Sequence, residues 1–231
     1  TFRGKDGFWT VGSRNYTPQE MATRYMYENF PGDFLLWYYK RFAKYRNSNP
    51  NSVHKWLANK NLITQNIDGL DGKAGNKSYI PIHGRLDKVT AFHDQGFNAK
   101  IIDAPWQDIA NECPNEGDEK KLTSVLLDFF KISKKTLKPE KMRSLKPFVL
   151  LFDEFYTNIY RMNEAEKLMQ NSKKFIFLGT SFSVNITTIA LNYAHSNNAS
   201  IEIIDPNPVK LNLKNTKYYK MTASQYIENV S

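Results

Sequence analysis

Cysteine is almost absent from this chain of 231 residues, in which Cys113 is the only one. A single cysteine excludes a disulfide within the chain and a metal site built from several cysteines. It agrees with an intracellular, reducing location, cytoplasmic or in an organellar matrix, between which the sequence does not distinguish. The chain also lacks an apolar run of about 18 residues, which a helix needs to cross a bilayer, so we expect no membrane span.

Positive charge is in excess, with 32 Lys and Arg against 23 Asp and Glu and a formal net charge of +9. The basic residues are spread along the sequence instead of forming a stripe, so we do not expect nucleic-acid binding. With 41% apolar residues, the chain is long enough for one large domain or two small ones with a real core. No targeting segment is visible at Thr1, and any such segment would lie upstream.

A cluster of polar side chains follows a short apolar segment, Leu62 to Thr64, which we interpret as the end of a buried strand. Gln65, Asn66 and Asp68 then bring three hydrogen-bonding side chains into four positions. Gly69 permits a sharp turn after them. Because ligands of open parallel sheets bind beyond the carboxyl ends of strands, this cluster predicts a site for a ligand with an amide and sugar hydroxyls.

His83 has a similar position after a second short apolar run, Ile80 to Ile82, and before Gly84. An imidazole with an ordinary pKa near 6.5 suits a general base. The alternative is a polar turn at a strand end, with a histidine that caps the structure.

A strand–turn–helix–strand unit is predicted near the end of the chain, in the order 175–178, Gly179-Thr180-Ser181, 186–195 and 201–204. A glycine turn with two hydroxyls before a helix can cradle a phosphate or a ribose. Asn207 follows the second strand, about where a dinucleotide fold has its ribose-binding residue. The alternative for Asn207 is a turn former between two prolines.

The motifs Thr64-Gln65-Asn66-Ile67-Asp68-Gly69-Leu70 and Ile82-His83-Gly84 resemble the core motifs of the sirtuins, which are NAD-dependent protein deacylases. Further matches at both ends extend the resemblance over nearly the whole chain. It implies an α/β fold with a doubly wound, Rossmann-like parallel sheet and a small lobe, within one catalytic domain, 1–231. The expected division is a Rossmann-like part of 1–13, 61–84 and 147–231, and a small lobe of 14–60 and 85–146, with the NAD cleft between them.

The resemblance also implies roles for particular residues. His83, Asn66 and Asp68 are the expected catalytic residues. The expected NAD-binding residues are Phe2, Arg3, Gln65, Asn66, Asp68, Gly179, Thr180, Ser181 and Asn207. The substrate is an acylated lysine of a protein or peptide, whose acyl group passes to ADP-ribose as nicotinamide leaves.

The start of the chain resembles the sirtuin loop that covers the nicotinamide side of NAD, with Phe2 and Arg3 in the places of its Phe-Arg pair. The strand and the Gly-Ala-Gly turn that precede this loop in the family are absent. We therefore expect the sequence to be a portion of a longer chain, with a degenerate protein as the alternative.

The segment after His83 departs from the family. Most sirtuins hold a zinc ion there with two Cys-x-x-Cys pairs, whereas Gly84 to Lys146 contains Cys113 alone. A closed zinc site needs four ligands, so we expect no metal. An amphipathic helix over 122–131 is expected to supply an apolar core instead, after an exposed loop over 115–121.

Residues 147–154 resemble the sirtuin segment that pairs with the substrate peptide as an added strand, with Val149, Phe152 and Glu154 as substrate-binding residues and Asp153 in place of the usual glycine. Tyr38 and Arg41 match the Tyr-x-x-Arg spacing of sirtuins that prefer acidic acyl groups such as succinyl-lysine. A phenol and a guanidinium can bind a carboxylate together. The alternative is a surface pair on an amphipathic helix.

Two rival functions stay open from the sequence. One is an NAD hydrolase, in which water is the nucleophile and no peptide groove is needed. The other is a structural subunit of a larger complex that has lost catalysis. The remaining helices are expected at 18–29, 34–46, 51–60 and 158–171, and from a cap at Thr222 to the end of the chain.

Overall fold

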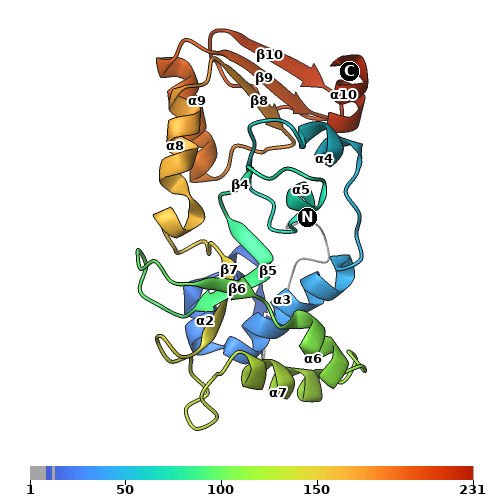
Figure 1. Cartoon of the computed structure of the whole chain (residues 1–231), viewed down its shortest axis with the longest axis vertical. Coiled ribbons are helices and arrows are strands. Elements are labelled where there is room, and N and C mark those ends of the chain that lie inside the picture. Colours follow the sequence, from blue (N-terminus) through green and yellow to red (C-terminus); the bar gives the residue numbers. More distant parts are fainter. Residues whose placement is uncertain (1–8, 12–13, 231) are drawn as a thin grey trace. The chain divides into compact units, whose positions relative to one another are not determined.

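The computed structural model describes residues 9–11 and 14–230, which form two compact units (Figure 1). Among the described residues, unit 1 comprises 9–11, 14–48, 64–69 and 81–162, and unit 2 comprises 49–63, 70–80 and 163–230. Each unit is described by itself. These units group the chain differently from the expected Rossmann-like part and small lobe, because residues 85–146 and 147–162 fall together in unit 1.

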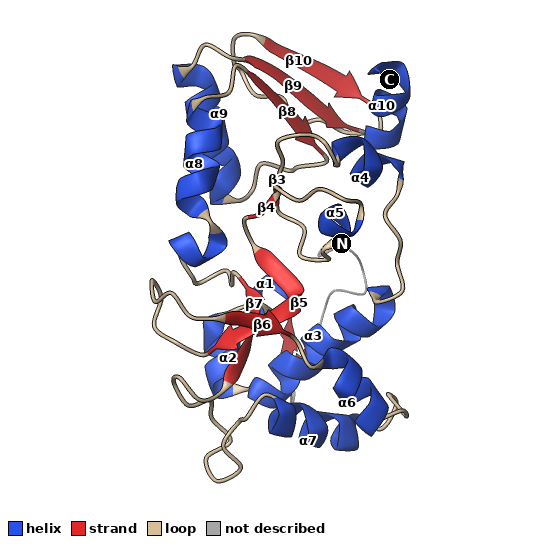
Figure 2. Cartoon of the chain, in the orientation of Figure 1, coloured by secondary structure: helices blue, strands red, loops and turns tan. Residues whose placement is uncertain are grey.

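Unit 1 combines short strands with helices (Figure 2). Its elements are β1 (Trp9–Val11), β2 (Arg14–Tyr16), α1 (Pro18–Met21), α2 (Arg24–Asn29), α3 (Pro31–Tyr45), β5 (Gly84–Ala91), β6 (Ile101–Asp103), α6 (Trp106–Glu112), α7 (Glu119–Phe129), β7 (Leu145–Val149) and the 3-10 helix η2 (Asn158–Tyr160). β5 is the central strand of an antiparallel sheet with the order β6-β5-β7. β3 (Ile63–Thr64) pairs with β4 (Ile80–Pro81).

The first predicted helix, 18–29, is wrong as a single element. It is divided into α1 and α2 because Thr23 has an extended backbone and its hydroxyl accepts a hydrogen bond from the Met26 N–H, which starts a new helix. The next helix begins at Pro31 instead of Phe34. Proline fits the first turn of a helix, where its missing N–H would have no partner.

The core of unit 1 is rich in aromatic side chains from α3, and Phe34, Trp37, Tyr38 and Tyr39 are fully buried. Their spacing places them around most of the helix circumference, so α3 is surrounded by packed elements. Phe34 and Trp37 each lie 4.8 Å, between ring centroids, from Tyr38. Such aromatic contacts add about 0.5–1.5 kcal/mol each to the burial of apolar area.

The helices α6 and α7 contribute apolar side chains to the core of unit 1. Trp106, Ile109, Leu122 and Leu126 are buried in the core of unit 1, and the Trp106 Nε1–H donates to the Leu86 carbonyl at 2.7 Å. The predicted helix over 122–131 is thus present as α7. The expected loop over 115–121 is partly wrong, because α7 already begins at Glu119.

That early start has a local cause. The Asp118 carboxylate caps α7 by accepting from the Lys121 N–H at 3.1 Å. The cap orders the charged residues that lead into the helix.

Unit 2 contains a parallel sheet. Its elements are α4 (Ser52–Leu57), α5 (Leu70–Lys73), β8 (Lys174–Leu178), α9 (Asn185–Ser196), β9 (Ser200–Asp205), β10 (Thr216–Lys220) and α10 (Ala223–Val230), with most of α8 (Met162–Gln170). The strand order within the described residues is β10-β9-β8, and α9 is the crossover between β8 and β9. The predicted α/β class is confirmed, whereas β10 escaped prediction.

Two helix boundaries bear on the predictions. The predicted helix over 158–171 is interrupted at Arg161 of unit 1, whose φ of 60° is left-handed and ends the 3-10 helix before α8 begins. Thr222 caps α10 as expected, since its hydroxyl accepts from the Gln225 N–H while the Gln225 side chain accepts from the Thr222 N–H.

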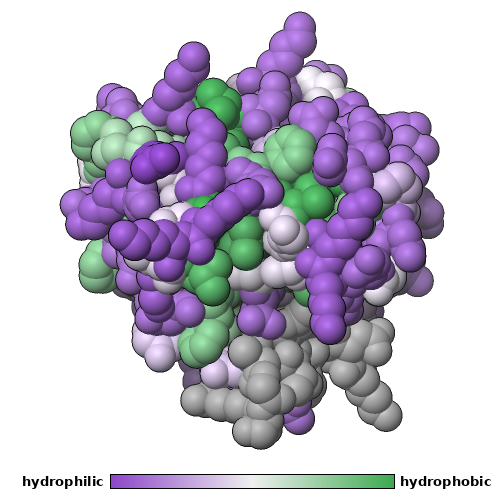
Figure 3. All heavy atoms as spheres, turned by 90° about the horizontal axis from the view of Figure 1, so that it is seen from below, coloured by the Kyte–Doolittle hydropathy of each residue, from purple (hydrophilic) through white to green (hydrophobic). Residues whose placement is uncertain are grey.

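No helix in the described part of the chain is long and apolar enough to cross a membrane. In the view of Figure 3, hydrophilic residues cover most of the visible face and smaller hydrophobic areas lie between them.

Candidate functional site

His83 lies where the chain enters β5, and the residue after it is forced to be glycine. Gly84 has a φ of +78°, and a Cβ atom on it would lie 2.0 Å from the Phe148 carbonyl oxygen of β7. The backbone on each side is bonded to its surroundings: the His83 carbonyl accepts from the Leu150 N–H at 3.0 Å, and Gly84 pairs with Val149. The close approach of β5 and β7 therefore fixes the backbone that carries the imidazole.

The polar loop that follows β3 is held beside His83. The Ile82 N–H donates to the Thr64 carbonyl at 3.1 Å, and the Asn66 N–H donates to the Thr64 hydroxyl at 3.2 Å. The Ile67 carbonyl accepts from the Leu86 N–H of β5 at 2.7 Å. With its backbone anchored at these points, the loop exposes the side chains of Asn66 and Asp68, while Gln65 is half-buried.

The imidazole of His83 has two hydrogen-bonding partners. Its Nε2 lies 2.9 Å from the Tyr156 hydroxyl, and the ring also bonds to the backbone of Gln65. Burial lowers the pKa of His83 from 6.5 to about 4, against the smaller opposing effect of the Gln65 hydrogen bond. The ring is therefore neutral at physiological pH and can accept a proton. Tyr156 escaped the sequence prediction, since nothing in its own neighbourhood indicates a contact with His83.

The segment predicted to bind substrate has a buried start and an exposed middle. Val149 is buried in β7, whereas Phe152 exposes 55% of its surface. The N–H groups of Leu150, Leu151 and Phe152 donate to the His83 carbonyl, a Glu154 carboxylate oxygen and the Ala22 carbonyl. A peptide strand that pairs with this segment must therefore use other backbone groups.

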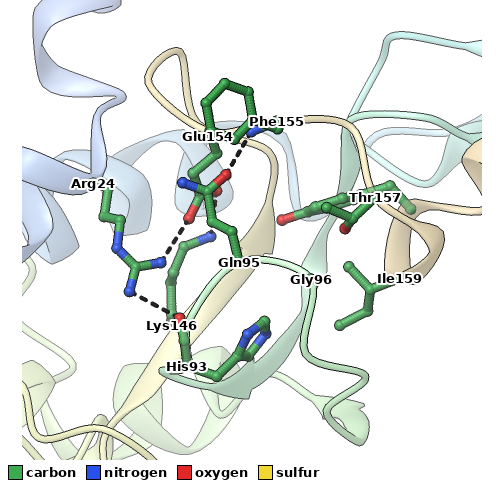
Figure 4. Close-up of a pocket in the computed structure, with 10 residues that line it drawn as sticks. Arg24, His93, Gln95, Gly96, Lys146, Glu154, Phe155, Thr157 and Ile159 are labelled. Atoms are coloured by element: carbon green, nitrogen blue, oxygen red, sulfur yellow. Dashed lines mark hydrogen bonds and ion pairs between the residues drawn. The ribbon is translucent and has the colours of Figure 1, made fainter.

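Glu154 is occupied by a buried ion-pair network (Figure 4). Its carboxylate lies 3.1 Å from Lys146 Nζ and 3.4 Å from Arg24 Nη1, and both the Glu154 and the Lys146 side chains are 5% exposed. Burial lowers the pKa of Lys146, and the charge of Glu154 opposes that effect. The structure thus gives the Glu154 side chain a scaffolding contact.

The network borders a hollow that is open to solvent. Its walls are formed by Arg24, His93, Gln95, Gly96, Lys146, Glu154, Phe155, Thr157, Ile159 and Tyr160. The cationic donors already have acceptors, since Arg24 Nη2 donates to the His93 carbonyl at 2.8 Å and Lys146 Nζ donates to the Val149 carbonyl at 2.8 Å. The first bond joins α2 to the loop after β5, and the second lies within β7. The ion pairs of Glu154 with Arg24 and Lys146 join the turn after β7 to α2 and β7.

Asp153, which stands where sirtuins have a glycine, contributes to the same attachment. Its two carboxylate oxygens accept from the N–H groups of Arg24 at 2.6 Å and Tyr25 at 3.1 Å, at the start of α2. A carboxylate at a helix N-terminus satisfies N–H groups that have no partner within the helix.

Tyr38 and Arg41 lie on α3. The Tyr38 hydroxyl is buried without a hydrogen-bond partner among the described residues. The Arg41 guanidinium stacks 3.3 Å above the centroid of the Trp37 ring, and Nη1 donates to the Trp37 carbonyl at 3.1 Å. Burial lowers the pKa of Arg41 to about 10, an effect that interaction with Tyr38 opposes.

In unit 2, the predicted glycine turn and Asn207 follow the carboxyl ends of the neighbouring parallel strands β8 and β9. Leu178 and Ile204, near the ends of β8 and β9, are paired, and the Gly179 N–H donates to the Ile204 carbonyl at 2.9 Å. Gly179 has a φ of +61°, and a Cβ atom on it would have no neighbour within 4 Å. Asn207 is exposed, with its N–H bonded to the Asp205 carboxylate at 2.7 Å.

The hydroxyls of the turn are also ordered. The Thr180 hydroxyl accepts from the Phe182 N–H at 3.4 Å, and the Ser181 and Ser183 hydroxyls are 2.8 Å apart. α9 begins just beyond, and its N-cap residue Val184 provides no side-chain cap. Open space beside a glycine, ordered hydroxyls and a helix N-terminus fit a phosphate or ribose.

Two of the expected NAD ligands, Phe2 and Arg3, lie outside the described residues. Within 9–11 and 14–230, no group of three or more His, Cys, Asp and Glu side chains could hold a metal ion, and Cys113 is buried.

Comparison with known proteins identifies the family. The model of the Sir2 family matches residues 1–186. Among curated relatives, "NAD-dependent protein deacylase 1" of Caldanaerobacter subterraneus subsp. tengcongensis is 28% identical over 98% of this chain and 84% of its own length. The "NAD-dependent protein deacylase" of Aquifex aeolicus is 29% identical over 100% of this chain and 86% of its own length.

Solved structures agree on the fold. A Sir2 homologue in complex with NAD has a TM-score of 0.72 at 23% identity, over 100% of this chain and 80% of its own. A Sir2 protein bound to a propionylated peptide has a TM-score of 0.66 at 18% identity, over 93% of this chain and 84% of its own. Since the family model covers most of the chain, the chain belongs to the Sir2 family, which the sequence resemblance predicted.

Proposed function

We propose that this protein is an NAD-dependent protein-lysine deacylase that transfers the acyl group to ADP-ribose and releases nicotinamide. Membership of the Sir2 family and the names of the relatives support the reaction class. The observation that carries the proposal is the joint anchoring of His83 and the Gln65–Asp68 loop in unit 1, which presents a neutral imidazole next to exposed amide and carboxylate groups.

The loop residues are proposed to hold the nicotinamide. A carboxamide has one acceptor oxygen and two N–H donors, so it needs an acceptor and a donor from the protein. Asp68 offers the acceptor, and Asn66 offers both kinds of group. The backbone bonds of Asn66 and Ile67 fix the loop in advance, so little conformational entropy is lost on binding. Gln65 completes the set.

His83 is the proposed base. NAD supplies the ribose carbon that accepts the acyl oxygen of the substrate and the nicotinamide that leaves. His83 then removes the proton of a ribose hydroxyl, whose oxygen bonds to the acyl carbon. The lysine amine leaves, and water adds to the acyl carbon so that its bond to the first ribose oxygen can break. An imidazole with its pKa near 4 is neutral at physiological pH, so its lone pair is available for the ribose proton.

Gly179, Thr180, Ser181 and Asn207 in unit 2 are proposed to bind the adenosine side of NAD. The ordered turn and the exposed Asn207 at the edge of a parallel sheet support this role. Phe2 and Arg3 stay proposed NAD ligands on the strength of their motif. One catalytic domain over 1–231, with a Rossmann-like part and a small lobe, also stays a proposal.

For the acylated peptide, we propose contact with Val149 and with the exposed Phe152. The ion pairs of Glu154 stabilise the turn that carries Phe152. Tyr38 and Arg41 are proposed to select an acidic acyl group, because a buried hydroxyl without a partner is costly unless a ligand supplies one. Succinyl-lysine should then be processed faster than acetyl-lysine, and Arg41→Met should reverse that order. The intracellular location stays a prediction from the single cysteine.

The test separates the binding loop from the base. His83→Ala should still exchange labelled nicotinamide in the presence of acyl peptide, while peptide turnover falls by about 10²–10⁴-fold. Asn66→Ala should reduce both. Nicotinamide release from the wild type that does not respond to acyl peptide would instead establish an NAD hydrolase. A wild type that neither binds NAD nor releases nicotinamide, once any missing upstream segment is restored, would leave a structural subunit as the function.

A further inference from the structure

The base of the proposed reaction is covered by a second side chain, the phenol of Tyr156. Its hydroxyl lies 2.9 Å from His83 Nε2, and the two rings are stacked with centroids 5.8 Å apart and planes inclined by 26°. Tyr156 follows β7 and is separated from His83 by 73 positions, so the contact arises only from the tertiary structure. Tyr156 has no role in the site inferred above.

The direction of the hydrogen bond between Tyr156 and His83 depends on the tautomer of the imidazole. A hydrogen bond from the ring to the Gln65 backbone, which opposes the lowering of the His83 pKa, favours a proton on the other ring nitrogen, Nδ1. In that tautomer Nε2 is an acceptor, and the Tyr156 O–H donates to the lone pair with which His83 would accept the substrate proton.

The segment that carries Tyr156 is firmly attached on both sides. Before it, Glu154 belongs to the buried ion-pair network, and the Phe155 N–H donates to Gln95 Oε1 at 2.6 Å (Figure 4). After it, the Tyr160 N–H donates to the Thr157 carbonyl at 3.0 Å. Moving Tyr156 away from His83 would break its hydrogen bond and leave a half-buried imidazole lone pair without a donor, at a cost of about 1–3 kcal/mol.

We propose that Tyr156 is a proton relay between a ribose hydroxyl of NAD and His83, an inference that rests on the function proposed above. The ribose O–H donates to the Tyr156 oxygen while the Tyr156 O–H donates to Nε2. As the ribose oxygen attacks, the Tyr156 proton moves to Nε2 and the ribose proton moves to the Tyr156 oxygen. The phenol is regenerated and His83 becomes an imidazolium. The ribose oxygen forms its new bond to the acyl carbon as the C=N π pair of the acyl-lysine adduct moves onto the lysine nitrogen.

The relay predicts a specific kinetic pattern for Tyr156→Phe, which keeps the ring and removes the hydroxyl. Peptide turnover should fall by about 10²-fold, while the KM for NAD and the exchange of labelled nicotinamide stay close to wild type. The double variant with His83→Ala should be no slower than His83→Ala alone, because the two groups act on the same proton. Tyr25→Phe, at an exposed tyrosine of unit 1, is the matched control and should keep full turnover.

A measurement without NAD tests the starting state. ¹⁵N NMR of the wild type should show His83 with the proton on Nδ1, and Tyr156→Phe should shift the Nε2 resonance through loss of its donor. A proton on Nε2 would mean that Tyr156 accepts, which overturns the relay.

The kinetic outcomes also distinguish the relay from the function beneath it. If the wild type is active, His83→Ala loses turnover and Tyr156→Phe turns over at or above the wild-type rate, the relay is wrong and the deacylase stands. If the wild type shows no chemistry on NAD, the deacylase is wrong and the relay falls with it.

Discussion

Each unit has a glycine with positive φ in a predicted motif, Gly84 in unit 1 and Gly179 in unit 2, but the surroundings of the two glycines differ. In unit 1, a Cβ atom on Gly84 would lie 2.0 Å from the Phe148 carbonyl oxygen, because the protein's own backbone fills that space. In unit 2, the space beside Gly179 is open to 4 Å. One glycine allows the fold to close around the base, and the other leaves room for a ligand.

The charged groups follow the same division. The pair Lys146–Glu154 of unit 1 is buried, with both side chains 5% exposed. The pair Lys174–Glu202 of unit 2 has side-chain exposures of 52% and 12%. Unit 1 thus holds its proposed catalytic groups by interior contacts, whereas the predicted ligand groups of unit 2 lie on an open edge. A glycine with positive φ thus allows close backbone packing in unit 1 and borders open space in unit 2.

Gly84→Ala should cause the largest loss of stability. The new Cβ has no space and the backbone is left-handed, so β5 and β7 must separate at His83. We expect a loss of more than about 4 kcal/mol in the free energy of unfolding, or failure to fold. Urea denaturation followed by fluorescence measures it, and a loss below about 1 kcal/mol would contradict the packing described for this position.

Glu154→Gln should have the next largest effect. It leaves the buried Lys146 ammonium without its carboxylate, which typically costs about 3–5 kcal/mol. Lys174→Met in unit 2 is the matched control, and removal of that partly exposed pair should cost no more than about 1 kcal/mol. Denaturant midpoints of the two variants provide the measurement. Equal losses would remove the distinction between the two ion pairs.

The stability of the wild type should depend on pH through His83. The pKa of His83 is about 4 in the fold against 6.5 unfolded, so the unfolded chain binds more protons between these values. The free energy of unfolding should therefore fall as pH falls from 6.5 towards 4. Above pH 6.5, His83 should cause no further change of stability with pH. The groups that contact the ring are the Tyr156 phenol and the Gln65 backbone.

His83→Gln should flatten that part of the pH profile, as measured by denaturation at several pH values. His195→Gln, at an exposed histidine of unit 2, is the control and should leave the profile unchanged. An unchanged slope in His83→Gln would show that other groups cause it.

Gly179→Ala should destabilise the protein much less than Gly84→Ala. No atom obstructs the new Cβ, so the stability loss should be limited to the strain of a left-handed alanine, about 1–2 kcal/mol. The methyl group would project into the space proposed for NAD, and we expect about tenfold weaker NAD binding by calorimetry, equivalent to about 1.4 kcal/mol. Unchanged affinity would place the ligand elsewhere.

Asp153→Ala should have the smallest effect. It removes two hydrogen bonds to the start of α2, at a cost of about 1 kcal/mol. Thermal unfolding should show a modest fall in Tm, and Asp153→Asn, which keeps an acceptor oxygen, should recover part of it. No change in either variant would mean that Asp153 contributes nothing to the cap.

Features that depend on neighbouring residues could be predicted from the sequence. The α/β class and the strand–turn–helix–strand unit around Gly179 follow from local apolar periods and turn residues. The same local patterns indicated that Asn66, Asp68 and His83 lie at the ends of apolar segments. The motifs that contain these three residues resemble those of the sirtuins, and this resemblance alone was enough to predict the Sir2 family.

Contacts between segments that are distant in the sequence could not be predicted in this way, because they arise from the packing of the folded units. The hydrogen bond between Tyr156 and His83 spans 73 positions, and the attachment of Asp153 to Arg24 of α2 spans 129, so no local sequence pattern indicates either contact. The short strand β10 was missed because its residues are held by pairing with β9 and carry little signal of their own. The low pKa of His83 likewise comes from burial, which is a property of the assembled unit and cannot be read from the residues beside it.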